Sequence, residues 1–313
     1  IYFGFHFEIF LEKNFNSRGH ERKKIKLRVD YKEHYFKKMS ATLTKDELLA
    51  LCEKKLTPLE VKNYLINEMS NRILGLDGAM GTMIQLEGLD DIDFTDNTIL
   101  DDFDKSNLKG NNELLNITRP NIIKNIHYQY YNSGSDICET NTFNGTLISQ
   151  KEYECESYVY DINKSATEIC RQAAIEVMKE EIENGATSIK YRFVAGAIGP
   201  TSSTLSISPK TEDPSYRSHT FDEVVASYKV QLKGLIENNV DILMVETIFD
   251  TLNAKAALYA IDEYYVENNI NIKDRLPLII SGTITDAAGR TLSGQTVEAF
   301  YISVRHANPL AIG

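Results

Sequence analysis

Six short apolar runs, separated by longer segments with helical periodicity, constrain the fold of this chain more than any other feature of its sequence. Each run is short and largely apolar, and none shows the in-out alternation of a strand that has one face in water. Parallel strands that are covered on both faces have this character. The runs occupy residues 73–76, 136–139, 193–198, 242–245, 278–280 and 310–312. The pattern therefore predicts an α/β fold built on a parallel sheet.

The segments between the runs are typical of amphipathic helices, and the one that follows Thr220 shows this well. Thr220 and Glu223 have the spacing of a capping box, in which each residue bonds the backbone of the other. An apolar stripe at helical spacing follows at Val224, Val225, Tyr228, Leu232, Leu235 and Ile236. We therefore predict a helix here, with the next strand opening at Asp241.

The N-terminal part of the chain differs from the rest. Residues 1–38 contain ten Lys or Arg and five Asp or Glu, and the first methionine is Met39. We expect residues 1–38 to be an extension that is disordered or lies outside the natural protein. Residues 39–71 follow as an N-terminal helical segment, in which a T-x-x-E pattern at Thr44 and a break at Pro58 predict two short helices.

Repeated strand and helix units over residues 72–313 fit two architectures, a doubly wound sheet and a closed (β/α)8 barrel of the TIM type. Periodicity alone does not choose between them. A closed barrel needs eight strands, and the chain supplies about five and a half βα units before Gly313. On the barrel interpretation, the barrel is therefore incomplete.

Composition and charge exclude several classes of function. A net charge of −11 argues against nucleic acid as a partner, because binding phosphates requires clustered Lys and Arg. No apolar run approaches the roughly 20 residues that a membrane span requires, so we expect no membrane partner. The four cysteines form no CxxC pair or disulfide framework, which fits a reducing compartment such as the cytoplasm.

Polar residues gather directly after the apolar runs, where ligands bind in both candidate architectures. Asp77, Glu139 and Glu246 stand at equivalent positions after three of the runs, with Thr140 and Asn141 beside the second of them. Three carboxylates around one mouth would suit an ammonium group or another cation. The alternative is that each acid caps the helix that follows it. We favour a shared site, because one cap is common but three equivalent acids are not.

Glycine-flanked backbone in the same region offers a second kind of contact. Gly78 and Ala79 follow Asp77, and their N–H groups could receive a carboxylate, although a glycine after a strand is often only turn chemistry.

No metal-binding group stands out among the residues present. Cys138 lies within an apolar run and is interpreted as a buried core thiol. Cys155 and Cys170 have no partner at metal-ligand spacing, and the six histidines, His127 among them, are interpreted as solvated or structural. No cysteine follows a strand beside a candidate base, so the sequence predicts no cysteine nucleophile either.

Six longer strings carry a resemblance to a known family. They are LDGAMGTMIQ (76–85), KGNNELLNITRP (109–120), ETNTFNGT (139–146), GAIGPTSSTLSISP (196–209), VETIFDTLNAKAA (245–257) and SGTITDAAGRTLSGQT (281–296). In this order they closely resemble the homocysteine-binding module of cobalamin-dependent methionine synthases. The resemblance runs from about residue 73 to Gly313.

The resemblance implies a barrel that binds homocysteine with its thiolate on zinc. The methyl group would come from methylcobalamin, recharged by methyltetrahydrofolate, on pterin-binding and cobalamin domains that follow in the same polypeptide. By similarity, Asp77 and Glu246 would hold the amino group, and the amides of Gly78 and Ala79 the carboxylate. The side chains of Glu139, Thr140 and Asn141 would line the same mouth.

The three zinc cysteines of the resembled family are expected beyond Gly313. We therefore expect neither zinc nor cobalamin to be bound by the residues present, and we expect this chain alone to be inactive. Two alternatives stay open. One is a stand-alone homocysteine or thiol S-methyltransferase with another methyl donor, and the other is an inactive gene fragment.

Overall fold

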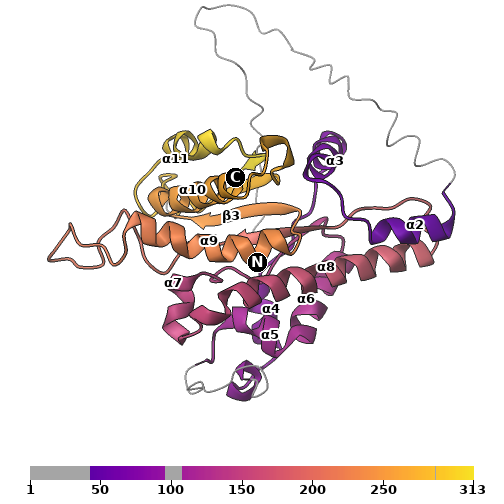
Figure 1. The fold of residues 1–313 in the computed structure, drawn as a ribbon, viewed down its shortest axis with the longest axis horizontal. Helices are drawn as coiled ribbons and strands as arrows, with labels where there is room; N and C mark the ends of the chain where they lie inside the picture. Colours follow the sequence, from indigo (N-terminus) through magenta and orange to yellow (C-terminus); the bar gives the residue numbers. More distant parts are fainter. Residues whose placement is uncertain (1–42, 96–107, 286) are drawn as a thin grey trace, which may run out of the picture.

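The computed structural model describes residues 43–95, 108–285 and 287–313 (Figure 1). The predicted extension over residues 1–38 lies outside these ranges. Within them, no helix combines the length and the apolar character that crossing a membrane requires.

A five-stranded parallel sheet forms the centre of the molecule. Its strands are β1 (Ile137–Glu139), β2 (Phe193–Ile198), β3 (Ile242–Ile248), β4 (Leu278–Gly282) and β5 (Ala311–Ile312). Their order in the sheet follows their order in the sequence. The predicted parallel α/β class is confirmed, and the sequential order differs from that of a doubly wound sheet, in which the strand order reverses. Over the described strands the sheet is open, so a closed barrel is not observed.

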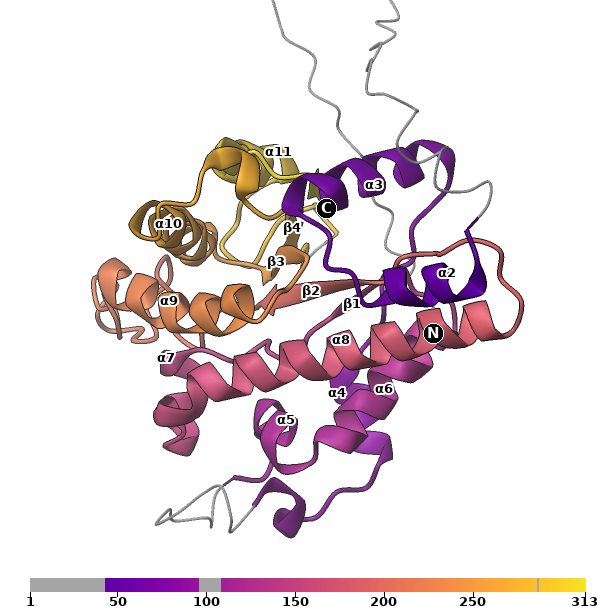
Figure 2. The same cartoon turned by 45° about the vertical axis from the view of Figure 1, so that its right-hand side comes forward.

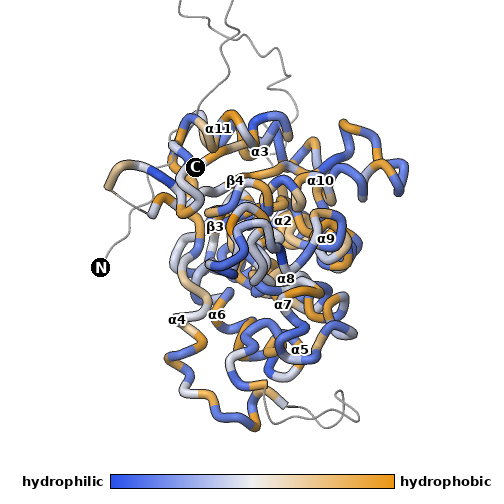
Figure 3. The backbone as a smooth tube through the Cα atoms, turned by 90° about the vertical axis from the view of Figure 1, so that its left-hand side faces the viewer, coloured by the Kyte–Doolittle hydropathy of each residue, from blue (hydrophilic) through white to orange (hydrophobic). Residues whose placement is uncertain are grey.

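Ten α-helices are described around the sheet. They are α2 (Lys45–Cys52), α3 (Pro58–Asn71), α4 (Met80–Leu86), α5 (Leu115–Thr118), α6 (Pro120–Asn132), α7 (Leu147–Gln150), α8 (Val159–Glu183), α9 (Phe221–Glu237), α10 (Thr251–Glu267) and α11 (Val297–Val304). The longer helices in Figure 3 alternate between orange and blue along the chain, as amphipathic helices do.

The capping boxes predicted at Thr44 and Thr220 are both present, and Pro58 opens the first turn of α3. The two short N-terminal helices and the helix that follows Thr220 are therefore confirmed.

The two faces of the sheet are covered by different helices (Figure 2). On one face, strand residues such as Val194 and Leu243 pack against α8, α9 and α10. On the other face, Ile137 and Met244 pack in a second cluster with α2 and α3. Both faces are therefore buried, which explains why the strands are apolar without alternation.

The first apolar run, residues 73–76, is not a strand. Only Leu76 forms a parallel bridge, to Ile137, and Ile73 is 94% exposed. The Asp136 side chain accepts a hydrogen bond from the Gly75 N–H at 2.8 Å, so this amide is not available to a ladder. The run therefore lies beside β1 without extending the sheet by a full strand.

Gly199, directly after β2, lies too close to a neighbouring loop to carry a side chain. A Cβ atom there would be 2.5 Å from the backbone oxygen of Phe143. We expect Gly199→Ala to lower the free energy of unfolding by about 1–3 kcal/mol, as overpacking does, in urea denaturation. Gly81→Ala, inside α4 with its nearest neighbour at 3.8 Å, is the control. An equal loss in both variants would contradict this explanation.

Candidate functional site

Three acidic side chains lie toward the carboxyl ends of parallel segments of the sheet. Asp77 follows the bridge at Leu76, Glu139 ends β1, and Glu246 lies within β3. Side chains two residues apart in a strand share a face. Glu139 therefore lies on the same face of the sheet as Ile137, and Glu246 on the same face as Met244. Nearer the amino ends of the strands, α2 and α3 cover this face.

The backbone of β3 is irregular where Glu246 stands. The register between β3 and β4 shifts between Val245 and Ile248, and Thr247 has a φ of +54°. A β-branched residue in the left-handed region is strained, and a bulge changes the direction of a neighbouring side chain. The sequence predicted a strand that ends at Val245, and this irregular extension places Glu246 inside the strand instead.

The three carboxyl groups lie close enough for the charge of one to raise the pKa of another. Asp77 Oδ2 accepts a hydrogen bond from the Glu139 N–H at 3.0 Å, which links Asp77 to the end of β1. Like charges gathered in this way favour the protonated form of each acid.

Burial is the main reason that these groups resist ionisation. It raises the pKa of Asp77 to about 8, with a further contribution from the charge of Glu246. Burial, followed by the charges of Glu246 and Asp77, raises the pKa of Glu139 well above its ordinary value, and burial raises the pKa of Glu246. In the described part of the chain, no Lys or Arg contributes to these shifts. The cluster is thus a set of half-buried acids without a cationic partner among the described residues.

Helix capping does not account for these acids. The N-cap of α4 is Ala79, without a side-chain hydrogen bond, whereas α7 is capped by Thr146 and α10 by Asp250. The alternative that each acid caps the next helix is therefore wrong.

The side chains of Thr140 and Asn141 are engaged in holding the backbone. Thr140 Oγ1 accepts a hydrogen bond from the Ala197 N–H at 3.0 Å. Asn141 Nδ2 donates to the backbone oxygen of Asn112 at 2.7 Å and to Oδ1 of Asn116 at 3.2 Å. Both residues are buried. The structure brings them next to Glu139 but directs their polar groups into the scaffold.

Gly78 and Ala79 form the turn between Asp77 and α4. Tyr130 packs against Gly78, where an added Cβ would lie 3.0 Å from the tyrosine oxygen, and the Tyr130 hydroxyl donates to the Ala79 carbonyl at 3.5 Å. Among the described residues, neither the Gly78 nor the Ala79 N–H has a hydrogen-bond partner. Both amides are therefore available to an acceptor.

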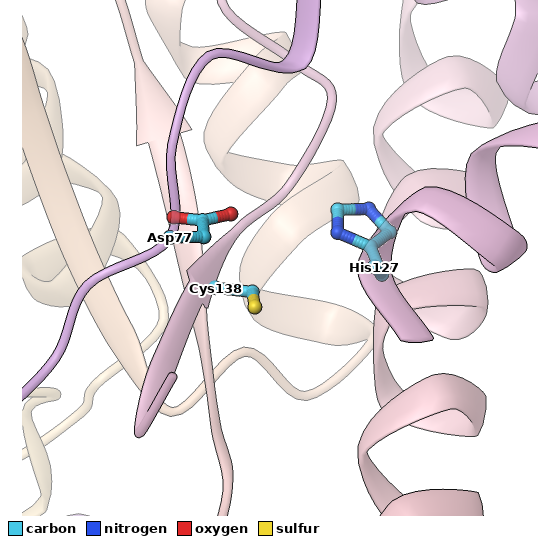
Figure 4. A group of neighbouring side chains, drawn as sticks. All are labelled: Asp77, His127 and Cys138. Carbon is cyan, nitrogen blue, oxygen red and sulfur yellow. The ribbon is translucent and has the colours of Figure 1, made fainter. Parts of the chain in front are cut away.

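The structure also assembles a group that the sequence analysis missed. Ligand atoms of Asp77, His127 and Cys138 all lie within 4.8 Å of one another (Figure 4). Cys138 is buried, as expected of a core thiol, and His127 on α6 faces β1 from the same buried helix face as Ile123 and Tyr131. The position of His127 on the apolar face of its helix could have indicated from the sequence that it is buried. Its proximity to Asp77 and Cys138 could not be predicted, because the three residues are far apart in the sequence.

Comparison with known proteins places these observations in a family. The sequence model described as homocysteine S-methyltransferase matches residues 74–313, which is most of the chain. The chain belongs to the homocysteine S-methyltransferase family. The match begins just before the Leu76 bridge and includes every strand of the sheet.

Solved structures support the same fold. The metallated form of the homocysteine methyltransferase MmuM from Escherichia coli is 17% identical, with a TM-score of 0.57, over 81% of this chain and 77% of that chain. Its oxidized form is also 17% identical, with a TM-score of 0.55, over 78% of this chain and 73% of that one. At this identity the likeness shows the fold, and the family match carries the chemistry of a methyltransferase.

The donor atoms of the Asp77, His127 and Cys138 group fit the zinc that the resemblance implies. Zinc binds thiolate sulfur, imidazole nitrogen and carboxylate oxygen, and this group offers one of each. His127 is fully buried, and neither of its ring nitrogens has a hydrogen-bond partner in the described structure. This set differs from the three cysteines that the resembled family uses.

Proposed function

We propose that the acidic cluster of Asp77, Glu139 and Glu246 binds the ammonium group of homocysteine. The observation that carries this proposal is three neighbouring, half-buried carboxyl groups without a cationic partner among the described residues. An ammonium group would supply the missing positive charge and up to three hydrogen-bond donors. The family match to homocysteine S-methyltransferases supports an amino-acid thiol as the ligand.

The backbone beside the cluster would hold the other end of the amino acid. The N–H groups of Gly78 and Ala79 would donate to the homocysteine carboxylate, since both are free of other partners in the described structure. Thr140 and Asn141 would act by fixing the loop that follows Glu139. With both charged groups of the substrate fixed, its thiol is oriented toward the methyl donor. A zinc ion, when bound, would lower the pKa of a coordinated thiol and so favour the nucleophilic thiolate.

The methyl donor in this proposal is methylcobalamin, recharged by methyltetrahydrofolate on further domains of a methionine synthase. The strings LSISP and RTLSGQT support this choice, because they resemble the cobalamin-dependent enzymes. On this proposal residues 72–313 form the front part of a (β/α)8 barrel, residues 39–71 its N-terminal helical segment, and the enzyme is cytoplasmic. A stand-alone homocysteine methyltransferase with another donor is the second candidate, and it is equally consistent with the family match.

Titration calorimetry with L-homocysteine under reducing conditions tests the ammonium site. We expect Glu246→Gln to weaken binding about tenfold to a hundredfold, because a hydrogen bond to a charged group contributes about 1.5–3 kcal/mol. The matched control is Glu168→Gln, which removes the same charge from an exposed position on α8. It should leave the affinity unchanged.

A second ligand makes this test specific for the amino group. The compound 4-mercaptobutanoate is homocysteine without its ammonium group, and the wild-type chain should bind it more weakly. In Glu246→Gln, the difference in affinity between homocysteine and 4-mercaptobutanoate should be smaller than in the wild-type chain. Equal affinity of the wild-type chain for both compounds would show that the acidic cluster does not recognise the ammonium group.

A further inference from the structure

We propose that Asp77, His127 and Cys138 form a binding site for a zinc ion or a similar borderline-soft divalent cation. The donor set differs from the three cysteines that the resembled family uses. The site shares Asp77 with the proposed ammonium site, but the two can be tested separately because metal binding is measured without homocysteine.

The geometry of the three ligand atoms carries the proposal. Three atoms within 4.8 Å of one another lie no more than about 2.8 Å from a common point, and zinc binds nitrogen, oxygen and sulfur at about 2.0–2.3 Å. A cation at that point therefore requires each side chain to move by less than about 1 Å.

The state of His127 is the second observation. Its side chain is fully buried on α6, and both ring nitrogens lack a hydrogen-bond partner among the described residues. Buried polar groups are almost always paired, so this imidazole requires an explanation. Its ring faces Asp77 and Cys138 across the space between α6 and β1 (Figure 4). A cation there would give one nitrogen a ligand bond.

Charge and orientation also suit a divalent cation. A carboxylate, a thiolate and a neutral imidazole together carry two negative charges, which Zn²⁺ neutralises in this buried position. Asp77 is already oriented by the hydrogen bond from the Glu139 N–H, as the ligands of metal sites usually are. Asp77 is the half-exposed member of the three, so the cation would enter from its side. Glu139 and Glu246 then remain as acceptors for an ammonium group.

Metal analysis of the 313-residue chain tests the proposal. The purified chain is treated with a chelator, incubated with Zn²⁺ and freed of unbound metal by gel filtration. We expect one equivalent of zinc in the wild-type chain and at least a tenfold loss of zinc affinity in Cys138→Ser and His127→Leu. The matched control is Cys170→Ser, since Cys170 is a second buried thiol behind β1 and lies outside the group. It should retain the metal.

Cobalt provides a second readout, and its result in the wild-type chain does not depend on how well the variants fold. Co²⁺ in the wild-type chain should show a thiolate-to-cobalt charge-transfer band and the absorption of a tetrahedral ion, and Cys170→Ser should show the same spectrum. No retained zinc and no such band in the wild-type chain would overturn the proposal. Retention of both in Cys138→Ser would also overturn it.

Discussion

Asp136→Ala is expected to lower the free energy of unfolding by about 3–5 kcal/mol, the usual consequence of removing one member of a buried ion pair. The Asp136 carboxylate is 3% exposed. It accepts two hydrogen bonds from Arg72, at 2.8 and 2.9 Å, and one from the Gly75 N–H at 2.8 Å. Lys190 lies 3.1 Å away and Arg192 3.7 Å away. Without Asp136, the buried Arg192 would keep only Glu181 as an acidic partner.

Urea denaturation measures this loss, and Asp262→Ala is the control. Asp262 pairs with Arg275 but is 64% exposed, so its removal should cost less than about 1 kcal/mol. Burial raises the pKa of Asp136, but hydrogen bonds from Arg72, Gly75 and Lys190 outweigh this effect and hold it below its usual value. The stabilisation is therefore present above the unfolded-state pKa and is lost as the pH falls through the folded-state pKa. If Asp136→Ala lost no more free energy of unfolding than Asp262→Ala, the ion pairs and hydrogen bonds of Asp136 would not stabilise the fold.

The contrast between the two ends of the sheet supports the functional interpretation. At the amino-terminal ends of the strands, Asp136 pairs with three cations and Asp241 pairs with Arg171 at 2.6 Å. At the carboxyl ends, Asp77, Glu139 and Glu246 have no such partner among the described residues. The acidic side chains at the amino ends are thus neutralised by ion pairs that stabilise the fold. The acidic side chains at the carboxyl ends are left without ion pairs in the described structure, and this is the end of the sheet where parallel α/β proteins bind ligands.

Much of the fold could be predicted from the sequence, because its signals are local. Residues 193–198 are apolar throughout and form β2 with the predicted bounds, and the capping pattern at Thr220 opens α9. The exception at residues 73–76 has a non-local cause. There, Asp136 engages the Gly75 amide from a position 61 residues away, and composition alone does not reveal this.

The candidate site was only partly accessible to the same reasoning. Their equivalent positions after the apolar runs predicted that Asp77, Glu139 and Glu246 would share one end of the sheet. The bulge at Thr247 and the proximity of His127 to Cys138 depend on tertiary packing, for which a single sequence has no periodic signal. Likewise, nothing local distinguishes an asparagine that binds a ligand from one that, like Asn141, bonds Asn112 and Asn116.

Asp250→Ala is expected to release the segment over residues 200–219 and to lower the free energy of unfolding by about 2–4 kcal/mol. The Asp250 carboxylate accepts hydrogen bonds from the N–H groups of Leu205 and Ser206, at 2.7 and 2.8 Å, and caps α10 through Leu252 at 2.9 Å. Loss of a cap costs about 1 kcal/mol, and each hydrogen bond to a charged group contributes about 1.5–3 kcal/mol, without full additivity.

Limited trypsin digestion reports on this segment separately from global unfolding, because Lys210 and Arg217 are cleavage sites within it. In the wild-type chain, Arg217 Nε donates to the Leu205 carbonyl at 2.6 Å, next to the Asp250 contacts. We expect cleavage at Arg217 to accelerate at least tenfold in Asp250→Ala. In Asp213→Ala, which removes an exposed acid from the same segment, the rate should change little. Equal rates in all three proteins would mean that Asp250 caps α10 without holding the segment beside β3.

The lowered pKa of Asp250 predicts how the segment over residues 200–219 responds to acidic pH. Burial raises this pKa, but hydrogen bonds from Ser206, Leu205 and Leu252 outweigh burial and keep it below its ordinary value. A depressed carboxyl pKa stabilises the docked segment above the unfolded-state pKa, and the effect is lost as the pH falls through the folded-state pKa. Asp250→Asn keeps one acceptor oxygen and removes the titration. An acid-active protease should therefore show segment opening with falling pH in the wild-type chain and a flatter profile in Asp250→Asn.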